Sequence, residues 1–151
     1  MKDLLKRTFH DFAIGKTGAN ATFSYNFKNF ITGDYPSFSI DYSLTLVSRG
    51  DLPNAINHSV QAIGNGQLQF NRTNNSGTGQ AKGSDKFIGV IHFPQQNRTF
   101  YSNGFDKRKQ EMATLNTRYL SGKTVECWSI FISANEQEVA DSVYPGGVII
   151  L

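Results

Sequence analysis

The residues best placed to do chemistry stand between positions 90 and 105. An apolar run ends at Pro94, and a polar loop with two neighbouring aromatic residues, Phe100 and Tyr101, follows it. Basic residues stand on both sides of these rings: Arg98, Lys107, Arg108 and Lys109. Flat amphipathic rings stack on sugar faces or lie among lipid headgroups, while the cations favour phosphate. The segment therefore predicts a site for a sugar or a lipid headgroup.

A purely structural role for the same rings is the alternative interpretation. Phe100 and Phe105 would then pack beneath a following helix, which we expect of Phe105. For Tyr101 both burial and exposure stay open.

The other reactive residue types do not form a catalytic or metal-binding pattern. The three histidines, His10, His58 and His92, have no second His or Cys at metal-ligand spacing. The acidic residues are scattered and give no carboxylate pair for acid–base chemistry. Cys127, the only cysteine, stands in an apolar run, which indicates a buried thiol rather than a nucleophile. Distant residues can still assemble a triad, but the sequence predicts a binding protein, not an enzyme, with no cofactor and no metal.

Alternation of apolar and polar residues predicts that the chain is mainly β. The clearest alternation runs through 38–46, whose apolar face holds Phe38, Ile40, Tyr42, Leu44 and Leu46. A turn at 33–36 precedes this strand, a tight turn is expected at 64–66, and a mobile loop at 74–84. The expected strands are 22–28, 38–46, 58–63, 66–72, 87–93, 125–132 and 148–151. The tract at 22–28 would bury Phe23, Tyr25 and Phe27 or their complements, and Trp128 is expected in the core.

Two helices complete the prediction. Residues 3–12 place Leu5, Phe9 and Phe12 on one side of a short amphipathic helix. A longer helix is predicted over 105–120, where spacing near 3.6 is shared by Phe105, Arg108, Met112, Leu115 and Tyr119. The expected fold is a β-sandwich flanked by one main helix and a short N-terminal helix.

Length and charge narrow the class of protein. The 151 residues suit one domain, 1–151. The formal charge is only +3, and the sequence lacks the dense Lys and Arg clusters of a nucleic-acid binder. No apolar stretch approaches the about 20 residues that span a bilayer. The first residues lack the pattern of a secretion signal. We expect a soluble chain, and leave open whether it acts in the cytoplasm or at a cell surface.

The segment at 90–105 resembles the actinoporins, the pore-forming cytolysins of sea anemones, which carry a strand, a proline turn, Tyr-Ser-Asn and then a helix. Here the corresponding residues are His92-Phe93-Pro94 and Tyr101-Ser102-Asn103. Weaker similarity extends to 15–17, 66–70 and 146–150. Fungal fruit-body lectins share the β-sandwich fold of that family. The resemblance implies a membrane- or cell-surface-binding protein, either a pore-forming cytolysin or a glycan-binding lectin.

The chain departs from that family at several positions. The expected helix before Gly15 extends over about 12 residues at most, enough for roughly 18 Å of helix against a hydrocarbon core of about 30 Å. Gly104-Phe105 replaces a pair of tryptophans, and the family's tyrosine cluster reduces to Tyr119. The candidate ligand-binding residues are Pro94, Arg98, Phe100, Tyr101, Arg108, Arg118 and Tyr119. The expected partners are lipid headgroups or cell-surface glycans, with oligomerisation possible on membranes and no nucleic acid.

Overall fold

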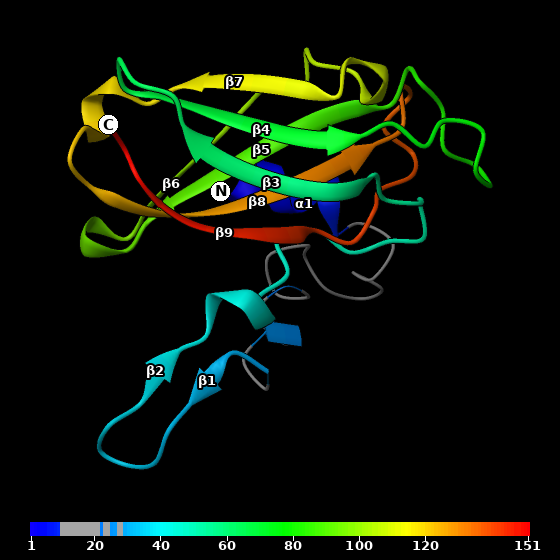
Figure 1. Ribbon diagram of the computed structural model, residues 1–151. Coiled ribbons are helices and arrows are strands. Elements are labelled where there is room, and N and C mark those ends of the chain that lie inside the picture. Colours follow the sequence, from blue (N-terminus) through cyan, green and yellow to red (C-terminus); the bar gives the residue numbers. More distant parts are fainter. Residues whose placement is uncertain (10–21, 23–24, 27–28) are drawn as a thin grey trace.

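Two antiparallel sheets form the body of the protein (Figure 1). The computed structural model describes residues 1–9, 22, 25–26 and 29–151. The three-stranded sheet has the order β3–β4–β7, and its strands are Ile56–Ala62, Gln67–Thr73 and Met112–Asn116. The four-stranded sheet has the order β6–β5–β8–β9, and these strands are Arg98–Tyr101, Lys86–Phe93, Thr124–Ile132 and Val143–Ile149. The prediction of a mainly-β chain is confirmed.

The strands with the simplest apolar patterns form where the sequence predicts them. In β4, every second residue is buried, including Leu68 and Phe70, as expected of a sheet with one face on the core. β5 and β8 are buried almost throughout, because both faces of the four-stranded sheet are covered. The tight turn before β4 is also confirmed: Gly64, Asn65 and Gly66 all have positive φ.

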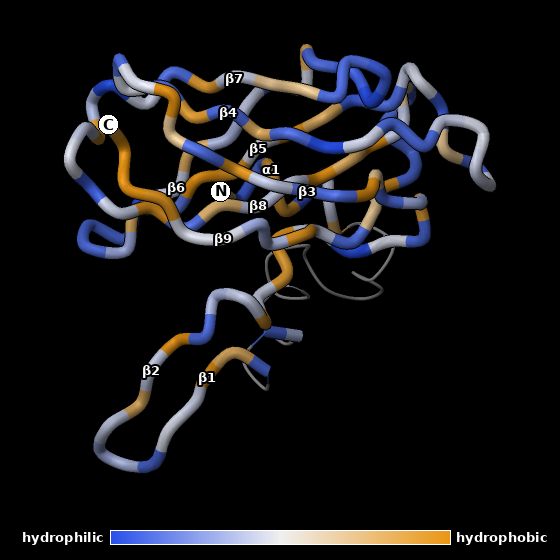
Figure 2. The backbone as a smooth tube through the Cα atoms, in the orientation of Figure 1, coloured by the Kyte–Doolittle hydropathy of each residue, from blue (hydrophilic) through white to orange (hydrophobic). Residues whose placement is uncertain are grey.

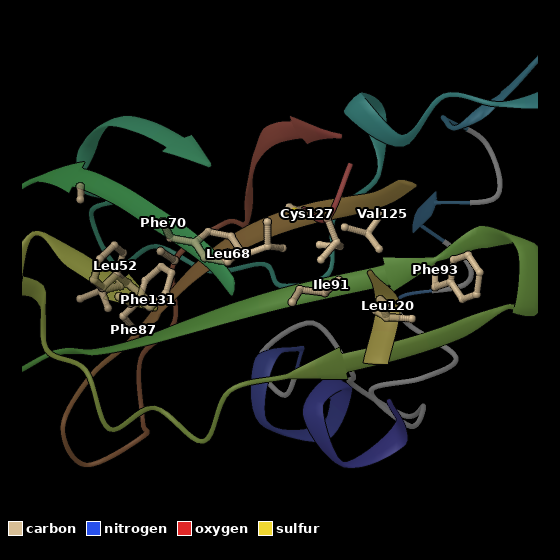
Figure 3. Close-up of a cluster of buried hydrophobic side chains, with 14 residues drawn as sticks. Leu52, Leu68, Phe70, Phe87, Ile91, Phe93, Leu120, Val125, Cys127 and Phe131 are labelled. Carbon is tan, nitrogen blue, oxygen red and sulfur yellow. The ribbon is translucent and has the colours of Figure 1, made fainter. Parts of the chain in front are cut away.

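The main core lies between the two sheets (Figure 3). The three-stranded sheet contributes Leu68, Phe70 and Ala113. The facing side chains come from β5 and β8: Phe87, Ile91, Phe93, Val125, Cys127 and Phe131. Burial raises the pKa of the Cys127 thiol to about 12, so the buried, unreactive thiol predicted for this position is confirmed.

A second cluster covers the outer face of the four-stranded sheet. Trp128 and Val90 point away from the main core and pack against Leu4 of helix α1 (Lys2–Thr8) and Val47. Trp128 is only 2% exposed, which confirms its predicted burial. The short N-terminal helix is also confirmed, with Leu5 and Phe9 buried, whereas residues 10–12 of the predicted span lie outside the described residues.

The predicted helix over 105–120 is wrong. The chain forms the 3-10 turn η4 (Arg108–Gln110), strand β7 and a second 3-10 turn η5 (Arg118–Leu120). Phe105 is 82% exposed, so it is not a core residue. Glu111 has φ 56°, which an α-helix does not allow. The following residues alternate between exposed and buried positions, and this two-residue period fits the edge of a sheet.

The two N-terminal strand predictions are also wrong. Within 22–28 the described residues Thr22, Tyr25 and Asn26 are helical, and Phe23 and Phe27 lie outside the described residues. The alternating tract at 38–46 forms β2 (Ser39–Ile40) and the 3-10 turn η2 (Tyr42–Leu44). β2 pairs with β1 (Ile31–Thr32) in a separate two-stranded hairpin. This hairpin projects from the body (Figure 1).

Two further segments of the prediction change. The loop after the 3-10 turn η3 (Pro94–Gln96) contains strand β6, which the sequence pattern did not predict. The last strand covers Val143–Ile149 instead of 148–151. Across the part of the chain that the structure describes, no helix has the length and hydrophobicity required to cross a membrane.

Candidate functional site

A cavity of about 410 Å³ opens on the outer face of the four-stranded sheet. The residues that matter for its chemistry are Phe30, Tyr42, His92, Asn97, Thr99 and Trp128. Its volume lies in the range of small-molecule sites, about 300–1,000 Å³. Aromatic walls with a few converging polar groups are typical of such sites, so this cavity is the candidate site.

Strand register brings the sheet residues of the site together. His92 of β5 lies opposite Thr99 of β6 and opposite Glu126 of β8. Residues directly opposite each other project from the same face of a sheet. Trp128 stands two positions after Glu126 and therefore shares that face. Three strands thus place an imidazole, a hydroxyl, a carboxylate and an indole side by side.

The aromatic wall is completed by Tyr42, which comes from the segment before β3. Asp41 caps the turn η2, and its carboxylate accepts a hydrogen bond from the Ser43 backbone N–H at 3.0 Å. The Tyr42 ring centroid lies 6.1 Å from that of Trp128 and 5.7 Å from that of His92. The Trp128 indole N–H donates to the Thr45 carbonyl at 2.9 Å, which holds this segment over the sheet.

Neutral polar groups surround the rings. His92 Nδ1 lies 2.9 Å from Thr99 Oγ1 in a hydrogen bond. Burial lowers the pKa of His92, although the Glu126 charge opposes this shift, so the imidazole is neutral near pH 7. Asn97 is exposed and has φ 50° at the end of η3, a left-handed conformation that asparagine tolerates. These side chains therefore offer both hydrogen-bond donors and acceptors.

The carboxylate of Glu126 is already bound within the protein. The Tyr144 hydroxyl donates to Glu126 Oε2 at 2.5 Å. Burial, followed by this hydrogen bond and the Glu126 charge, raises the pKa of Tyr144, and burial and the same charge raise the pKa of Tyr42. No hydrogen bond joins His92 to Glu126 among the described contacts, so the Thr99–His92 pair lacks the carboxylate that orients the base in a hydrolytic triad.

Arg108, a predicted ligand-binding residue, is instead buried inside the protein. Its Nε forms an ion pair with Asp85 Oδ2 at 3.0 Å, and both side chains are at most 1% exposed. Its other nitrogens donate to Asn75 Oδ1 and to the Pro53 carbonyl, at 2.8 and 2.7 Å. The guanidinium carbon lies 4.2 Å from the centroid of the Phe131 ring. The prediction that Arg108 binds a ligand is wrong, because no part of the side chain reaches solvent.

The predicted pair Phe100 and Tyr101 is split between the two faces of β6. Phe100 packs against the main core, whereas Tyr101 packs against the outer cluster. On the Phe100 side, the Arg98 guanidinium carbon lies 5.1 Å from the Phe100 ring centroid. The exposed Tyr119 ring lies 5.0 Å from the same ring. The structure thus brings Arg98, Phe100 and Tyr119 together and leaves Tyr101 on the opposite face.

The remaining predicted residues flank these positions without joining them. Pro94 begins the turn η3 at the end of β5 and is half-buried. Arg118 is the first residue of η5. Its backbone packs against Gly66, and its side chain is exposed. The seven predicted residues therefore do not form one site.

One family accounts for nearly the whole chain. A model described as a family of unknown function (DUF6266) matches residues 1–146. The chain belongs to this family. No curated protein matches the sequence. The DUF6266 match begins one residue before α1 and ends within β9. It therefore includes every residue of the candidate site.

One solved structure is similar to this DUF6266 chain at the level of backbone shape. It is the fibronectin type III domain of the human collagen alpha-1(XX) chain, with a TM-score of 0.47 and 10% sequence identity. The superposition covers 66% of the DUF6266 chain and 86% of the collagen domain.

Sequence reasoning missed most of the site of this DUF6266 protein. Two signals were present: His92 and Glu126 are half-buried polar residues inside two strands that are otherwise largely apolar and buried. A polar side chain in such a strand often marks a covered face with a specific partner. Nothing local indicates that Tyr42 lies beside Trp128, because 86 positions separate them in the sequence.

Proposed function

We propose that this protein is a non-catalytic carbohydrate-binding domain, with its ligand in the cavity on the outer face of the four-stranded sheet. The observation that carries the proposal is the composition of this cavity. Aromatic rings of Phe30, Tyr42 and Trp128 line it, together with the neutral polar groups of Asn97 and Thr99.

A sugar matches both kinds of surface. The C–H faces of a pyranose are apolar and pack on aromatic rings, and its hydroxyls need donors and acceptors at the edge of those rings. Asn97 supplies an amide with both functions, and neutral His92 supplies one of each. Charged ligands fit less well, because the named lining side chains carry no charge when His92 is neutral.

Binding of a lipid headgroup was the other expectation from the sequence. It relied on cations beside Tyr101, but Arg108 is buried in an ion pair and Arg98 lies against Phe100 on the opposite face of β6. The predicted residues therefore do not form a headgroup site, and the proposal of an actinoporin-type cytolysin has no support from them. Cell-surface glycans are the partners that we favour.

The proposal is tested with a glycan array and a conformationally neutral substitution. Asn97→Gly removes the amide, while glycine adopts the φ of 50° without strain. Loss of one neutral hydrogen bond predicts binding about two- to tenfold weaker. The matched control is Asn65→Gly, since Asn65 is also exposed and has φ 52° but lies in the turn before β4.

A second pair of variants tests the aromatic wall. Tyr42→Ala should weaken binding by about two- to tenfold or more, whereas Tyr119→Ala, an exposed ring against the opposite side of the sheet, should bind as the wild type does. If Tyr119→Ala loses binding and Tyr42→Ala retains it, the ligand binds at Arg98, Phe100 and Tyr119. If no glycan binds the wild type, the carbohydrate proposal is wrong.

A further inference from the structure

The hairpin at residues 30–41 projects from the body as an apolar arm. Its strands, β1 and β2, are followed by η2 at the body (Figure 1). Both strands of this arm carry hydrophobic residues and lie apart from the two sheets of the body (Figure 2). We refer to residues 30–41 below as the arm.

Large side chains of the arm face solvent. Tyr35 is 86% exposed, Phe38 59% and Ile40 49%. The Tyr35 and Phe38 rings meet edge to face, with centroids 6.4 Å apart. A groove of about 510 Å³ runs along the base of the arm and is lined by Phe30, Ile31, Phe38, Ser39 and Ile40. Contiguous exposed apolar surface of this kind marks an interaction site.

Within the described residues, the ladder that joins the two strands of the arm is short. Its ladder has only two residue pairs, Ile31 with Ile40 and Thr32 with Ser39. A two-stranded hairpin of this size is marginally stable in water and needs packing against another surface. We therefore expect the apolar groove of the arm to pack against a further surface.

Charge indicates what kind of surface that is. The arm, residues 30–41, contains two acidic residues, Asp34 and Asp41, and no Lys or Arg, so it carries −2. The whole chain carries +3, so the remaining residues carry +5. An acidic apolar arm is attracted to a basic protein surface, and the body of the same chain is basic. Phosphate-bearing lipid surfaces are disfavoured by the same charges.

We propose that the arm docks on the body of a second copy of this chain. In a two-fold dimer each copy donates its arm and accepts the arm of its partner, so the contact is made twice. Reciprocal docking buries the apolar groove and pairs the acidic arm with the basic body. The arm's groove shares Phe30 and Ile40 with the carbohydrate cavity, but the inference does not rest on carbohydrate binding.

Sedimentation equilibrium of the full chain tests this proposal. The wild type should be a dimer at about 100 μM and should dissociate on dilution, and dissociation should increase with salt because the attraction is partly electrostatic. The double substitution Tyr35→Ser and Phe38→Ser should be monomeric at the same concentration. Both residues are exposed, so their replacement should not unfold the monomer. A melting temperature of the arm variant equal to that of dilute, monomeric wild type would confirm that the variant is folded.

Tyr119→Ser is the control, since Tyr119 is 61% exposed on the body and lies outside the arm; it should remain dimeric. A monomeric wild type at 100 μM, or an arm variant that remains dimeric, would overturn the proposal. Phosphatidylcholine vesicles provide the second readout. If a monomeric wild type binds them and the arm variant does not, the arm binds lipid and the dimer proposal is wrong.

Discussion

At the scale of single residues, Arg108 shows how one charge can change its meaning on folding. Its position in a basic stretch suggested a ligand contact, yet its partner Asp85 stands 23 positions earlier in the chain. The two side chains are buried together beneath Phe131. A sequence gives the charge of a residue but not which distant carboxylate neutralises it, so this role could not be predicted.

Arg108→Met should therefore destabilise the protein severely. Removal of the guanidinium leaves the buried Asp85 carboxylate without its cation and with the Lys82 backbone N–H as its remaining hydrogen-bond donor among the described contacts, which costs about 3–5 kcal/mol. The measurement is the free energy of unfolding from urea titration. Arg118→Met is the control, because Arg118 is exposed and should change the stability by less than about 0.5 kcal/mol. Equal stability of the two variants would mean that the Arg108–Asp85 pair does not support the fold.

At the scale of elements, the periodicity of side chains explains both the successes and the errors. β4, β5 and β8 were predictable because burial on one or both faces leaves an unambiguous pattern. The segment 105–120 was not, because a helical spacing of apolar residues coincided with a strand whose alternate residues are exposed. Its pairing with β4 decides the outcome, and such long-range pairing leaves no local signal.

Helix α1 has seven residues, too few to be stable alone, so its contacts hold it in place. Arg7 Nε and Nη2 donate to the Glu136 carboxylate at 3.1 and 2.9 Å. Lys86 Nζ donates to the same carboxylate at 2.8 Å. The Lys86 hydrogen bond and the two cations lower the pKa of Glu136, although burial opposes this shift. The carboxylate of Glu136, in the loop after β8, thus connects this loop to α1 and to β5.

Glu136→Gln should lower the melting temperature at pH 7 by about 1–3 °C. A carboxyl group whose pKa is lowered in the folded state stabilises that state above its unfolded pKa, about 4.3, and the benefit disappears as the pH falls through the folded pKa. The difference from the wild type should therefore vanish in acid. Glu138→Gln, an exposed neighbour, should match the wild type at both pH values. A pH-independent difference would contradict the assigned ion pairs.

At the scale of the whole molecule, the fold class followed from composition and alternation, but the candidate site did not. The site needs five segments at once: Phe30 before β1, the turn η2, β5, the end of η3 with β6, and β8. The register of the four-stranded sheet and long-range contacts such as the hydrogen bond from Trp128 to Thr45 bring them together. Residues next to one another in the sequence, such as Phe100 and Tyr101, are instead separated by the sheet.

Trp128 provides the most direct test of the carbohydrate-binding proposal. It is the only tryptophan in the chain, so its indole N–H gives one assignable signal in a ¹H–¹⁵N spectrum. We predict that titration with the glycan bound best on the array shifts this signal saturably, together with the amide signals of Asn97 and Thr99, which also line the cavity. Saturable shifts at Phe100 and Tyr119, with the Trp128 indole signal unchanged, would contradict the proposed site.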